Sequence, residues 1–519
     1  MNWRLIIRIT GMLLLIEAGM LALCALIGLL YGETDTAFAW TTLIAGGLGG
    51  VLIACGNRSR ANMSRKDGYF VVSIVWVVFT LIGMLPFLFS HTLPDVASAF
   101  FETMSGFTST GATVINDCDS QPHSLLMWRS LTQWIGGIGI IFFTIAILPA
   151  FGVGEVKLFA AEATGPLHDK VHPRISVAAK WIGTVYLALT ALCIITLLLC
   201  GMPMFDAFNY SLVTTATGGF GTHSAMLREV FNSPAIEYAL IFFMFVSGVN
   251  YTLIYYTILK GKLRNCFSDA ELRCYLIIVL VAVGLCTLVL TMEKMSGTEA
   301  TGFTQWLYST EEAFRESAFT VISLQTTTGL ATVDYTTWPT LLMPALLFVM
   351  FAGACSGSTS GGFKCVRWSI IFRVARNELR RIIHPRAIIP VRMNENVIPH
   401  SVVQTLLAFV ALFTGALLVG AFLLALFGIE VPTDIEYCQH CGAVINQEVP
   451  HEFNYYEALG LSMASLSNVG PGMGYYGPAH SWAILSPMAK YICAGLMLIG
   501  RLEIFPVLLL FTRGFWKKS

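Results

Sequence analysis

The hydrophobic residues of this chain gather in long, nearly uncharged stretches separated by short polar segments. Ten stretches reach the length of a membrane-crossing helix, and they cover about 9–31, 37–55, 69–90, 125–149, 177–200, 236–259, 274–292, 339–363, 401–429 and 483–511. A helix needs about 20 apolar residues to cross a hydrocarbon layer of roughly 30 Å. The strands of a membrane barrel would instead alternate between apolar and polar residues. The pattern therefore predicts an all-α integral membrane protein.

Four of the connecting loops end in nearly the same tetrapeptide. The copies are Thr108-Ser109-Thr110-Gly111, Thr215-Ala216-Thr217-Gly218, Thr326-Thr327-Thr328-Gly329 and Ser467-Asn468-Val469-Gly470. The residues before each copy suffice for a helix of about three turns. One hydrophobic stretch lies before each loop and one after it. The repeated unit is thus helix, pore helix, extended segment, helix, and it occurs four times after two extra N-terminal helices.

The repeats divide the chain into five parts. We expect a two-helix extension at 1–66, followed by pore repeats at 67–165, 166–265, 266–395 and 396–519. The four repeats would surround one pore with pseudo-fourfold symmetry. A single copy of the tetrapeptide could be no more than a turn after a helix. Four copies, each between two spans, favour a pore.

The repeated segment has the properties that cation conduction requires. Extended backbone at membrane depth is tolerated only where it lines water or is buried in protein. Four such segments around one axis would present rings of carbonyl oxygens, which can replace the hydration shell of an ion. Glycine permits backbone angles that a β-carbon forbids, and the partially negative C-terminus of each pore helix favours a cation. We therefore expect the four tetrapeptides to form a cation filter.

Several longer motifs carry a resemblance to a known family. They are QWIGGIGI at Gln133–Ile140, SGVNY at Ser247–Tyr251, GACSGSTSGGFK at Gly353–Lys364 and GRLE at Gly500–Glu503. With the four tetrapeptides, they resemble the Trk/Ktr/HKT superfamily, and within it the TrkH-type potassium uptake subunits. The resemblance extends over essentially the whole chain. It implies that potassium is the transported ion, since glycine in all four filters goes with potassium preference in this family.

Residues 353–362 interrupt a predicted span with four glycines and three serines. Both residue types have poor helix propensity, so the segment is expected to unwind the helix. It could be a flexible kink or a site of close helix packing. The resemblance implies an intramembrane gating loop below the filter. The candidate gating residues are Gly353, Ser356, Gly357, Ser358, Gly361, Gly362, Lys364 and Arg501.

Arg501 lies in the last predicted span, near mid-depth of the membrane. An arginine at this depth costs roughly 2.5–3.5 kcal/mol on insertion scales, so it should face water or a partner. One interpretation is a structural ion pair inside the helix bundle. The other, implied by the resemblance, is a positive barrier beside the ion path.

The basic residues are distributed unevenly between the two sides that alternate spans define. With the N-terminus inside, 25 of the 31 Lys and Arg residues fall in inner segments, namely 1–9, 57–67, 153–180, 260–273, 364–392 and 513–519. Cytoplasmic loops carry such an excess, so we expect both termini in the cytoplasm. The formal net charge is zero, which gives no reason to expect nucleic acid as a partner.

The basic segment 364–392 allows two interpretations. It could provide the topology signal and contact anionic lipid, or it could bind a cytoplasmic regulatory partner. The resemblance implies a ring of nucleotide-binding subunits of the TrkA type, a homodimer, and a bacterial cytoplasmic (inner) membrane. The chain itself has no GxGxxG motif after a strand and no Walker motif, so we expect no organic cofactor.

Other functions find less support in the sequence. A secondary transporter coupling potassium to sodium or protons would need acidic or histidine relays at mid-membrane, and Glu17 and Glu503 are nearly all that is available. An enzyme would need clustered catalytic groups, which the sequence does not indicate. Cys438, Gln439, His440 and Cys441, with His451 nearby, favour a local disulfide or free thiols over zinc.

Overall fold

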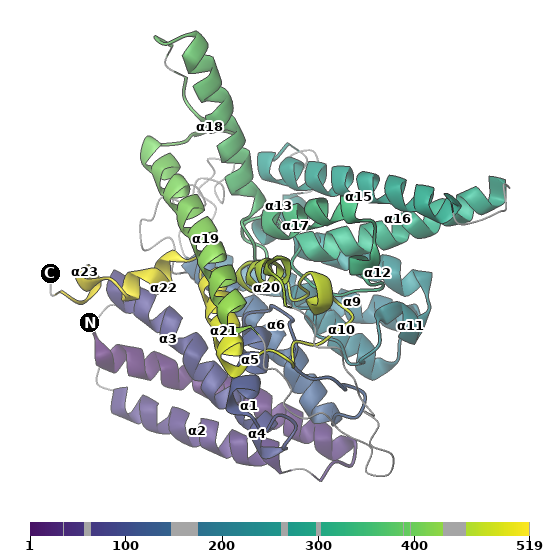
Figure 1. Cartoon of the computed structure of the whole chain (residues 1–519). Coiled ribbons are helices and arrows are strands. Elements are labelled where there is room, and N and C mark those ends of the chain that lie inside the picture. Colours follow the sequence, from purple (N-terminus) through teal and green to yellow (C-terminus); the bar gives the residue numbers. More distant parts are fainter. Residues whose placement is uncertain are drawn as a thin grey trace.

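The structure is a computed structural model that describes residues 1–34, 36–56, 64–146, 175–260, 268–296, 303–387, 389–394, 396–428 and 453–517. Most of this part is helical (Figure 1). Its strands, β1 (Arg392–Met393) and β2 (Asn396–Val397), form one short antiparallel hairpin. The all-α prediction is therefore confirmed. The insertion with Cys438, Cys441 and His451 lies outside the described residues.

The N-terminal extension is a pair of closely packed helices. They are α1 (Trp3–Leu30) and α2 (Ala37–Gly56). Glycines allow the two backbones to approach, since a Cβ atom on Gly11 would lie 2.8 Å from the carbonyl oxygen of Gly49. Small residues at crossing points are the usual means of close packing between membrane helices. The pair lies side by side at one edge of the molecule (Figure 1).

Each repeat begins with an outer helix and a pore helix. The outer helices are α3 (Arg65–Gly83) with α4 (Leu85–Phe89), α9 (Ile175–Leu199), α15 (Ala270–Ser296) and α19 (His400–Phe427). The pore helices are α5 (Val96–Phe107), α10 (Met204–Ala216), α16 (Phe303–Gln325) and α20 (Tyr455–Ser467). The pore helices are rich in buried residues, whereas the outer helices expose large apolar side chains such as Leu199, Leu280 and Phe422. Exposed apolar residues in such helices indicate contact with lipid.

The second helix of each repeat is the one most often broken. These helices are α6 (His123–Ala146), α12 (Pro234–Ser247) with α13 (Tyr251–Lys260), α17 (Met343–Ala352) with α18 (Cys365–Ile383), and α21 (Pro487–Arg501) with α22 (Phe505–Leu510). The second repeat bends by 99° between α12 and α13. The fourth breaks where Glu503 and Ile504 adopt φ angles of 57° and 63°. The remaining α-helices of the described residues are the short elements α11 (Leu227–Phe231) and α23 (Arg513–Trp516).

Fewer uninterrupted spans are present than the ten hydrophobic stretches suggested. Six helices of the described chain are long and apolar enough to cross a membrane, or seven if the bent pair α12–α13 is counted. The stretch 125–149 forms α6, which the structure describes only to Ala146. The stretches 339–363 and 483–511 are interrupted by backbone breaks. Hydropathy alone cannot detect a break inside an apolar segment, because glycine and serine change hydropathy little.

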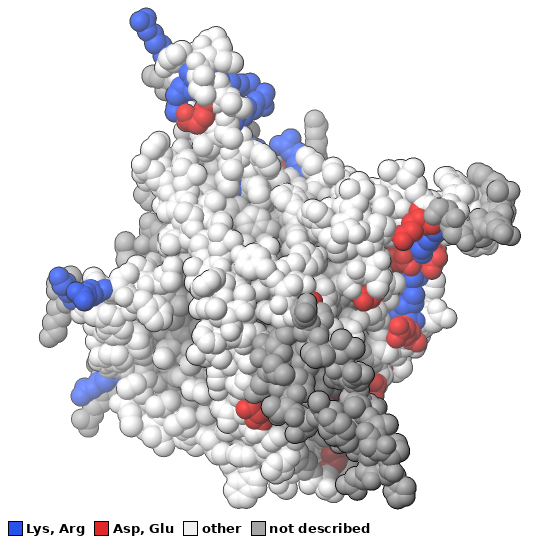
Figure 2. Space-filling view, in the orientation of Figure 1, with Lys and Arg blue, Asp and Glu red and all other residues white. Residues whose placement is uncertain are grey.

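Most of the Lys and Arg side chains on the visible surface lie at the ends of the molecule. Figure 2 shows a broad body that is mostly white with a few acidic patches, with Lys and Arg gathered on the protruding helix α18 and near the two termini. A mixed cluster lies at the ends of α15 and α16, where Lys294 pairs with Glu312 at 3.0 Å and Arg315 with Glu311 at 3.0 Å. An uncharged belt between charged ends is the surface expected of a protein that spans a membrane.

Candidate cation pathway

The four pore helices lead into segments with the same backbone conformation. One residue of each segment is left-handed, with φ of 52° at Ser109, 53° at Thr217, 55° at Thr327 and 56° at Asn468. Two residues later comes a glycine with positive φ, at 88° for Gly111, 91° for Gly219, 78° for Gly329 and 97° for Gly470. We call 108–111, 216–219, 326–329 and 467–470 the ring segments.

Backbone hydrogen bonds align the four ring segments in the same way as the φ angles do. The residue before each of these glycines donates its N–H to a carbonyl five residues earlier, in the pairs Thr110–Ser105, Gly218–Val213, Thr328–Ser323 and Val469–Ala464, at 2.8–2.9 Å. The second ring segment is therefore Ala216-Thr217-Gly218-Gly219, and Thr215 belongs to α10. The alignment inferred from sequence was displaced by one residue in this repeat. The sequence Thr-Ala-Thr-Gly at 215–218 resembles the other copies most closely. However, Gly219, and not Gly218, has the positive φ angle that the last glycine of the other three segments adopts.

The ring segments close into a ring through their glycines. A Cβ atom on Gly111 would lie closer than 3.0 Å to the carbonyl oxygen of Gly218. The same relation holds between Gly219 and the Thr328 carbonyl, between Gly329 and the Val469 carbonyl, and between Gly470 and the Thr110 carbonyl. Each repeat thus contacts the next, and the fourth returns to the first. No side chain fits at these four positions without moving backbone.

Side chains behind the ring brace it to neighbouring elements. Thr108 and Thr110 share a hydroxyl hydrogen bond of 2.8 Å, and Thr326 and Thr328 share another of 2.8 Å. The Gln133 amide donates to the Gly218 carbonyl at 2.7 Å. The Asn468 amide donates to Thr110 Oγ1 at 3.0 Å and to the Met497 carbonyl at 2.9 Å. Bracing between repeats holds the ring at a defined width.

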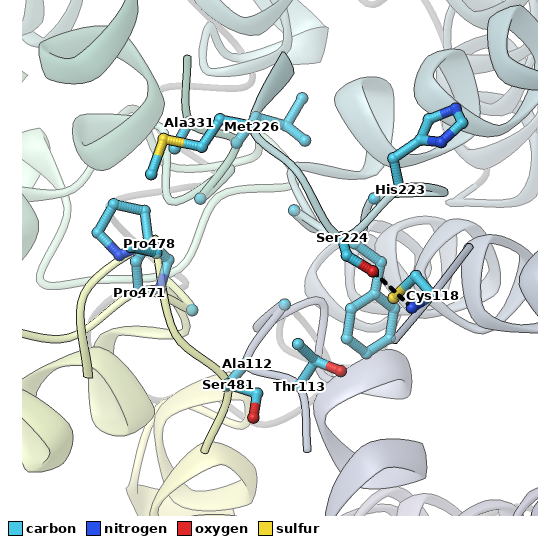
Figure 3. Close-up of a pocket in the computed structure, with 18 of the residues that line it drawn as sticks. Ala112, Thr113, Cys118, His223, Ser224, Met226, Ala331, Pro471, Pro478 and Ser481 are labelled. Atoms are coloured by element: carbon cyan, nitrogen blue, oxygen red, sulfur yellow. Dashed lines mark hydrogen bonds between the residues drawn. The ribbon is translucent and has the colours of Figure 1, made fainter. Parts of the chain in front are cut away.

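A hollow of about 160 Å³ lies against one face of the ring. Gly111, Gly219, Gly329 and Gly470 all line it, so residues of the four repeats meet there. Figure 3 shows side chains from separate repeats around this hollow, which we call the vestibule; the labelled ones are Ala112, Thr113, Cys118, His223, Ser224, Met226, Ala331, Pro471, Pro478 and Ser481. The vestibule is therefore a hollow that all four repeats share in front of the ring.

The rim of the vestibule carries a small acidic and histidine cluster. His223 Nδ1 lies 2.7 Å from Asp119 Oδ1, and its Nε2 lies 3.4 Å from Asp206 Oδ1. The hydrogen bond from His223, together with the Ser224 N–H at 3.0 Å, holds the pKa of the Asp119 carboxyl below its usual value. Asp119 therefore keeps its negative charge near neutral pH, and this charge favours cations at the rim.

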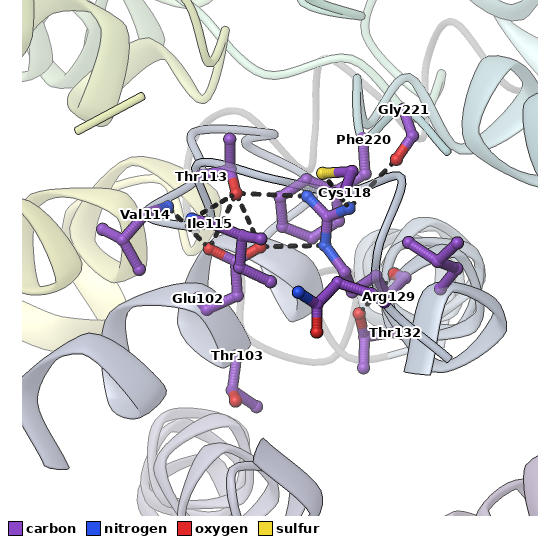
Figure 4. A network of polar contacts seen from close by, with 12 residues as sticks. Glu102, Thr103, Thr113, Val114, Ile115, Cys118, Arg129, Thr132, Phe220 and Gly221 are labelled. Carbon is purple, nitrogen blue, oxygen red and sulfur yellow. Dashed lines mark hydrogen bonds and ion pairs between the residues drawn. The ribbon is translucent and has the colours of Figure 1, made fainter. Parts of the chain in front are cut away.

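A buried ion pair of the first repeat lies beside the ring and reaches the second repeat through one further hydrogen bond (Figure 4). Arg129 Nε lies 2.9 Å from Glu102 Oε1, and both side chains are almost fully buried. Glu102 also accepts the Val114 N–H at 2.9 Å, and Arg129 donates to the Gly221 carbonyl at 3.0 Å. A buried pair of this kind stabilises little by itself, but breaking it leaves an uncompensated charge. Its role is to fix the chain just after two ring segments.

The glycine- and serine-rich segment lies against the opposite face of the ring. We call residues 353–364 the intramembrane loop; Gly353, Gly357, Gly362 and Lys364 in it have positive φ. The Gly361 N–H donates to Thr327 Oγ1 at 2.8 Å, and the Thr359 hydroxyl donates to the Thr215 carbonyl at 3.1 Å. The loop is thus in contact with the second pore helix and the third ring segment.

Arg501 completes this layer below the ring. Its guanidinium donates to the Thr359 carbonyl at 2.8 Å, to Ser109 Oγ at 3.1 Å and to the Gly136 carbonyl at 3.1 Å. Within the described residues, no carboxylate lies at ion-pair distance from Arg501. The ion-pair interpretation of this arginine is therefore wrong for the described chain, and its partners are neutral oxygens of the first repeat and of the loop.

Four contacts that hold the loop and the residues just after it are between segments far apart in the sequence, so the sequence did not predict them. Lys364 and Arg367 both form ion pairs with Glu503, and the Arg367–Glu503 distance is 2.9 Å. The bend between α12 and α13 also holds the loop, because the Cys355 N–H donates to the Gly248 carbonyl at 3.0 Å and the Tyr251 N–H donates to the Gly357 carbonyl at 3.1 Å. The SGVNY and GRLE motifs were the signals that marked these positions.

Comparisons with known proteins agree with this geometry. The family model described as TrkH, cation transport protein, matches residues 35–518. The chain is 35% identical to the Trk system potassium uptake protein TrkH of Salmonella typhimurium and 34% identical to that of Escherichia coli, over 100% of both chains in each case. It is 32% identical to TrkG of Escherichia coli over 89% of this chain and 87% of the relative.

A solved structure is similar over the same length. The crystal structure of the potassium transporter TrkH from Vibrio parahaemolyticus superimposes with a TM-score of 0.85 and 31% identity, over 100% of both chains. The predicted fold class, with four helix–pore-helix–helix repeats and two extra N-terminal helices, agrees with this likeness. The limits of the five parts and the roles of the individual site residues stay predictions.

The register of the second ring segment can be tested with two alanine variants. Gly219→Ala should reduce cation transport at least tenfold, because the new Cβ meets the Thr328 backbone and the residue has φ of 91°. For Gly218→Ala, the atoms nearest to the new Cβ belong to the Gln133 side chain. In a Gln133→Ala background it should cost less than threefold further. Uptake by cells that lack other potassium uptake systems measures both, and equal losses would contradict the register.

Proposed function

The chain belongs to the TrkH family of cation transport proteins, and from that premise we propose that it takes up potassium across the cytoplasmic membrane through a channel-like filter made by the ring segments. The observation that carries this proposal is the closed order of contacts in which each ring glycine meets a carbonyl of the next repeat. A ring formed by one chain gives each subunit its own pore. The protein would be a transporter and not an enzyme.

The proposed mechanism uses backbone oxygens in place of water. A hydrated potassium ion would collect in the vestibule, where the Asp119 carboxylate favours positive charge. At the ring it would exchange water for main-chain carbonyl oxygens. The C-terminal ends of α5, α10, α16 and α20 precede the ring segments, and their partial negative charge lowers the energy of a cation there. Potassium is the transported ion, and the mechanism needs no organic cofactor.

The intramembrane loop and Arg501 are the proposed gate. Together they contact parts of all four repeats below the ring: Ser109, Thr215 and Thr327 by hydrogen bonds, and the Ser467 carbonyl by the close approach of Gly361. An ion leaving the ring on this side would meet loop backbone and a guanidinium charge. Conduction therefore requires the loop to move and Arg501 to release Thr359.

The alternative is a secondary transporter that couples potassium to sodium or protons. Such a transporter needs acidic groups that can bind and release the coupling ion at mid-membrane. Glu503 is engaged by Lys364 and Arg367, and Glu17 is a buried residue of α1 in the N-terminal extension, outside the four pore repeats. These positions favour a passive filter with a gate.

The gate is proposed to respond to a cytoplasmic partner. The loop continues directly into α18, which protrudes from the body and carries a group of basic residues (Figures 1 and 2). We call α18 (Cys365–Ile383) the basic arm. Its basic side chains would bind a ring of nucleotide-binding subunits of the TrkA type, or anionic lipid. We further propose a homodimer in the bacterial inner membrane with both termini in the cytoplasm, in line with the distribution of Lys and Arg.

Ion currents separate the leading function from its alternative. The purified chain in a planar bilayer should give currents that reverse at the potassium equilibrium potential, and proton or sodium gradients should not move this reversal. The reason is that a carbonyl ring carries no titratable group and needs no coupling ion. A reversal potential that follows the proton or sodium gradient would establish the coupled transporter instead.

Shortening the loop tests the gate. Removal of residues within Gly353–Gly362 should raise potassium flux through the purified chain several-fold, because the hydrogen bonds to Thr215 and Thr327 that hold the loop below the ring would be lost. Flux into liposomes is compared at equal amounts of folded protein. Unchanged flux would remove the loop from the gate while leaving the filter proposal intact.

Arg501 provides a second test of the same barrier. Arg501→Ala, if folded, should conduct at least several-fold faster, since the variant loses both the charge and the hydrogen bonds to Thr359 and Ser109. Arg501→Lys keeps the charge but cannot make the same set of bonds, so an intermediate rate is expected. Single-channel recording provides the rates. A folded alanine variant with the wild-type rate would mean that this arginine acts only in structure.

A further inference from the structure

We propose that Glu271 is a positioning residue that holds the intramembrane loop against the ring, and that the β1–β2 hairpin adjusts this hold through the N-terminus of α15. The proposal rests on the gating role of the loop proposed above. It concerns how the loop is kept in its closed position. It also proposes that a chain of contacts connects α18 with the loop. Neither the ring nor Arg501 takes part in that chain of contacts.

Glu271 is a buried acidic residue that contacts the loop near the beginning of the loop. Its side chain is in the first turn of α15, and the residue is 3% exposed. Glu271 Oε1 accepts the Ser356 N–H. A carboxylate removed from water is costly unless its oxygens accept hydrogen bonds. The pairing of Glu271 with Ser356 therefore favours the loop position in which both groups are satisfied.

The loop is held by an acidic residue at each end. Glu271 binds Ser356 near the beginning of the loop, and Glu503 binds Lys364 and Arg367 at its end. The two carboxylates belong to different repeats, since Glu271 is on α15 of the third repeat and Glu503 follows α21 of the fourth. Release of the loop toward an open pore requires at least one of these contacts to break.

The hairpin caps the helix that carries Glu271. Asn394 Oδ1, in the turn between β1 and β2, accepts the Ala270 N–H at 3.0 Å, and its amide donates to Asp269 Oδ2 at 3.1 Å. Asp269 Oδ1 in turn accepts the N–H groups of Glu271 and Leu272, both at 2.9 Å. These bonds satisfy donors that a helix N-terminus otherwise leaves unpaired. Movement of the hairpin therefore moves the first turn of α15.

The hairpin is also packed against the base of the basic arm. Met393 and Ile398 share one small apolar cluster with residues of α15, α18 and α19; the other members are Ala270, Val366, Ile370, Val402, Val403 and Leu406. In addition, Arg373 of α18 donates to the Arg392 carbonyl at 2.6 Å. A partner or lipid surface that displaces α18 would thus displace the hairpin, the α15 cap and the contact between Glu271 and Ser356.

A purely structural role predicts the opposite effect on flux. If Glu271 served only to stabilise the fold, its replacement would reduce the amount of folded protein and would not speed conduction. If it positions the loop, its replacement frees a blocking element and raises the flux per folded molecule. The two roles therefore differ in sign, which makes flux at equal folded protein the deciding measurement.

The experiment uses the full chain in liposomes, with rubidium uptake as the readout and no other protein present. Glu271→Ala should raise basal uptake about tenfold or more, as expected from the loss of a buried hydrogen bond. Glu271→Gln keeps an acceptor oxygen for the Ser356 N–H and should stay within about threefold of wild type. Asn394→Ala should lie between the two. Glu293→Ala, at the other end of the same helix, is the matched control and should not change uptake.

Amide hydrogen exchange gives a second readout. In Glu271→Ala, exchange in the peptide covering 353–362 should become faster, while exchange in the ring segments stays unchanged. If Glu271→Ala does not fold, Asn394→Ala carries the same test, and wild-type uptake with wild-type loop exchange in that variant overturns the proposal. The loop-shortened variant is measured in parallel. If it conducts faster while Glu271→Ala does not, the positioning role is wrong and the gate stands; if neither is faster, the gate itself is wrong.

Discussion

The close approach of each ring glycine to a carbonyl of the next repeat is the contact on which the remaining structure depends. Gly111, Gly219, Gly329 and Gly470 leave no room for a β-carbon, and each adopts a positive φ. Four such contacts in cyclic order fix the diameter of the ring. The buried braces around it, such as Gln133 to the Gly218 carbonyl and the pair of Arg129 with Glu102, keep that diameter from relaxing.

The broken second helices follow from the same constraint. A straight helix below the ring would leave no place for a movable element, whereas breaks at 248–250, 353–364 and 502–504 place backbone polar groups next to one another. These groups satisfy each other, as in the Tyr251 N–H with the Gly357 carbonyl. Irregular backbone at membrane depth is tolerated on this condition. The proposed gate is thus held by many modest bonds and by the carboxyl groups of Glu271 and Glu503.

Much of this arrangement could be predicted from sequence, since hydropathy and the repeated tetrapeptide depend on local residue types. The helical class, the four repeats and the interruption at 353–362 were recognisable in that way. The one-residue register of Gly219 could not be fixed, because Gly218 and Gly219 differ only in backbone angle. The partners of Arg501, Lys364 and Glu271 lie more than 80 residues away along the chain. Contacts over that separation arise from packing and leave no local pattern.

The central claim is that main-chain oxygens of the four ring segments surround a permeating ion. Anomalous scattering from crystals grown in rubidium tests it most directly, because this ion substitutes for potassium and can be located independently of water. The account predicts anomalous density on the axis of the ring, at the level of the ring glycines and between carbonyl oxygens of all four repeats. Density confined to the vestibule or to side-chain carboxylates, with none inside the ring, would contradict it.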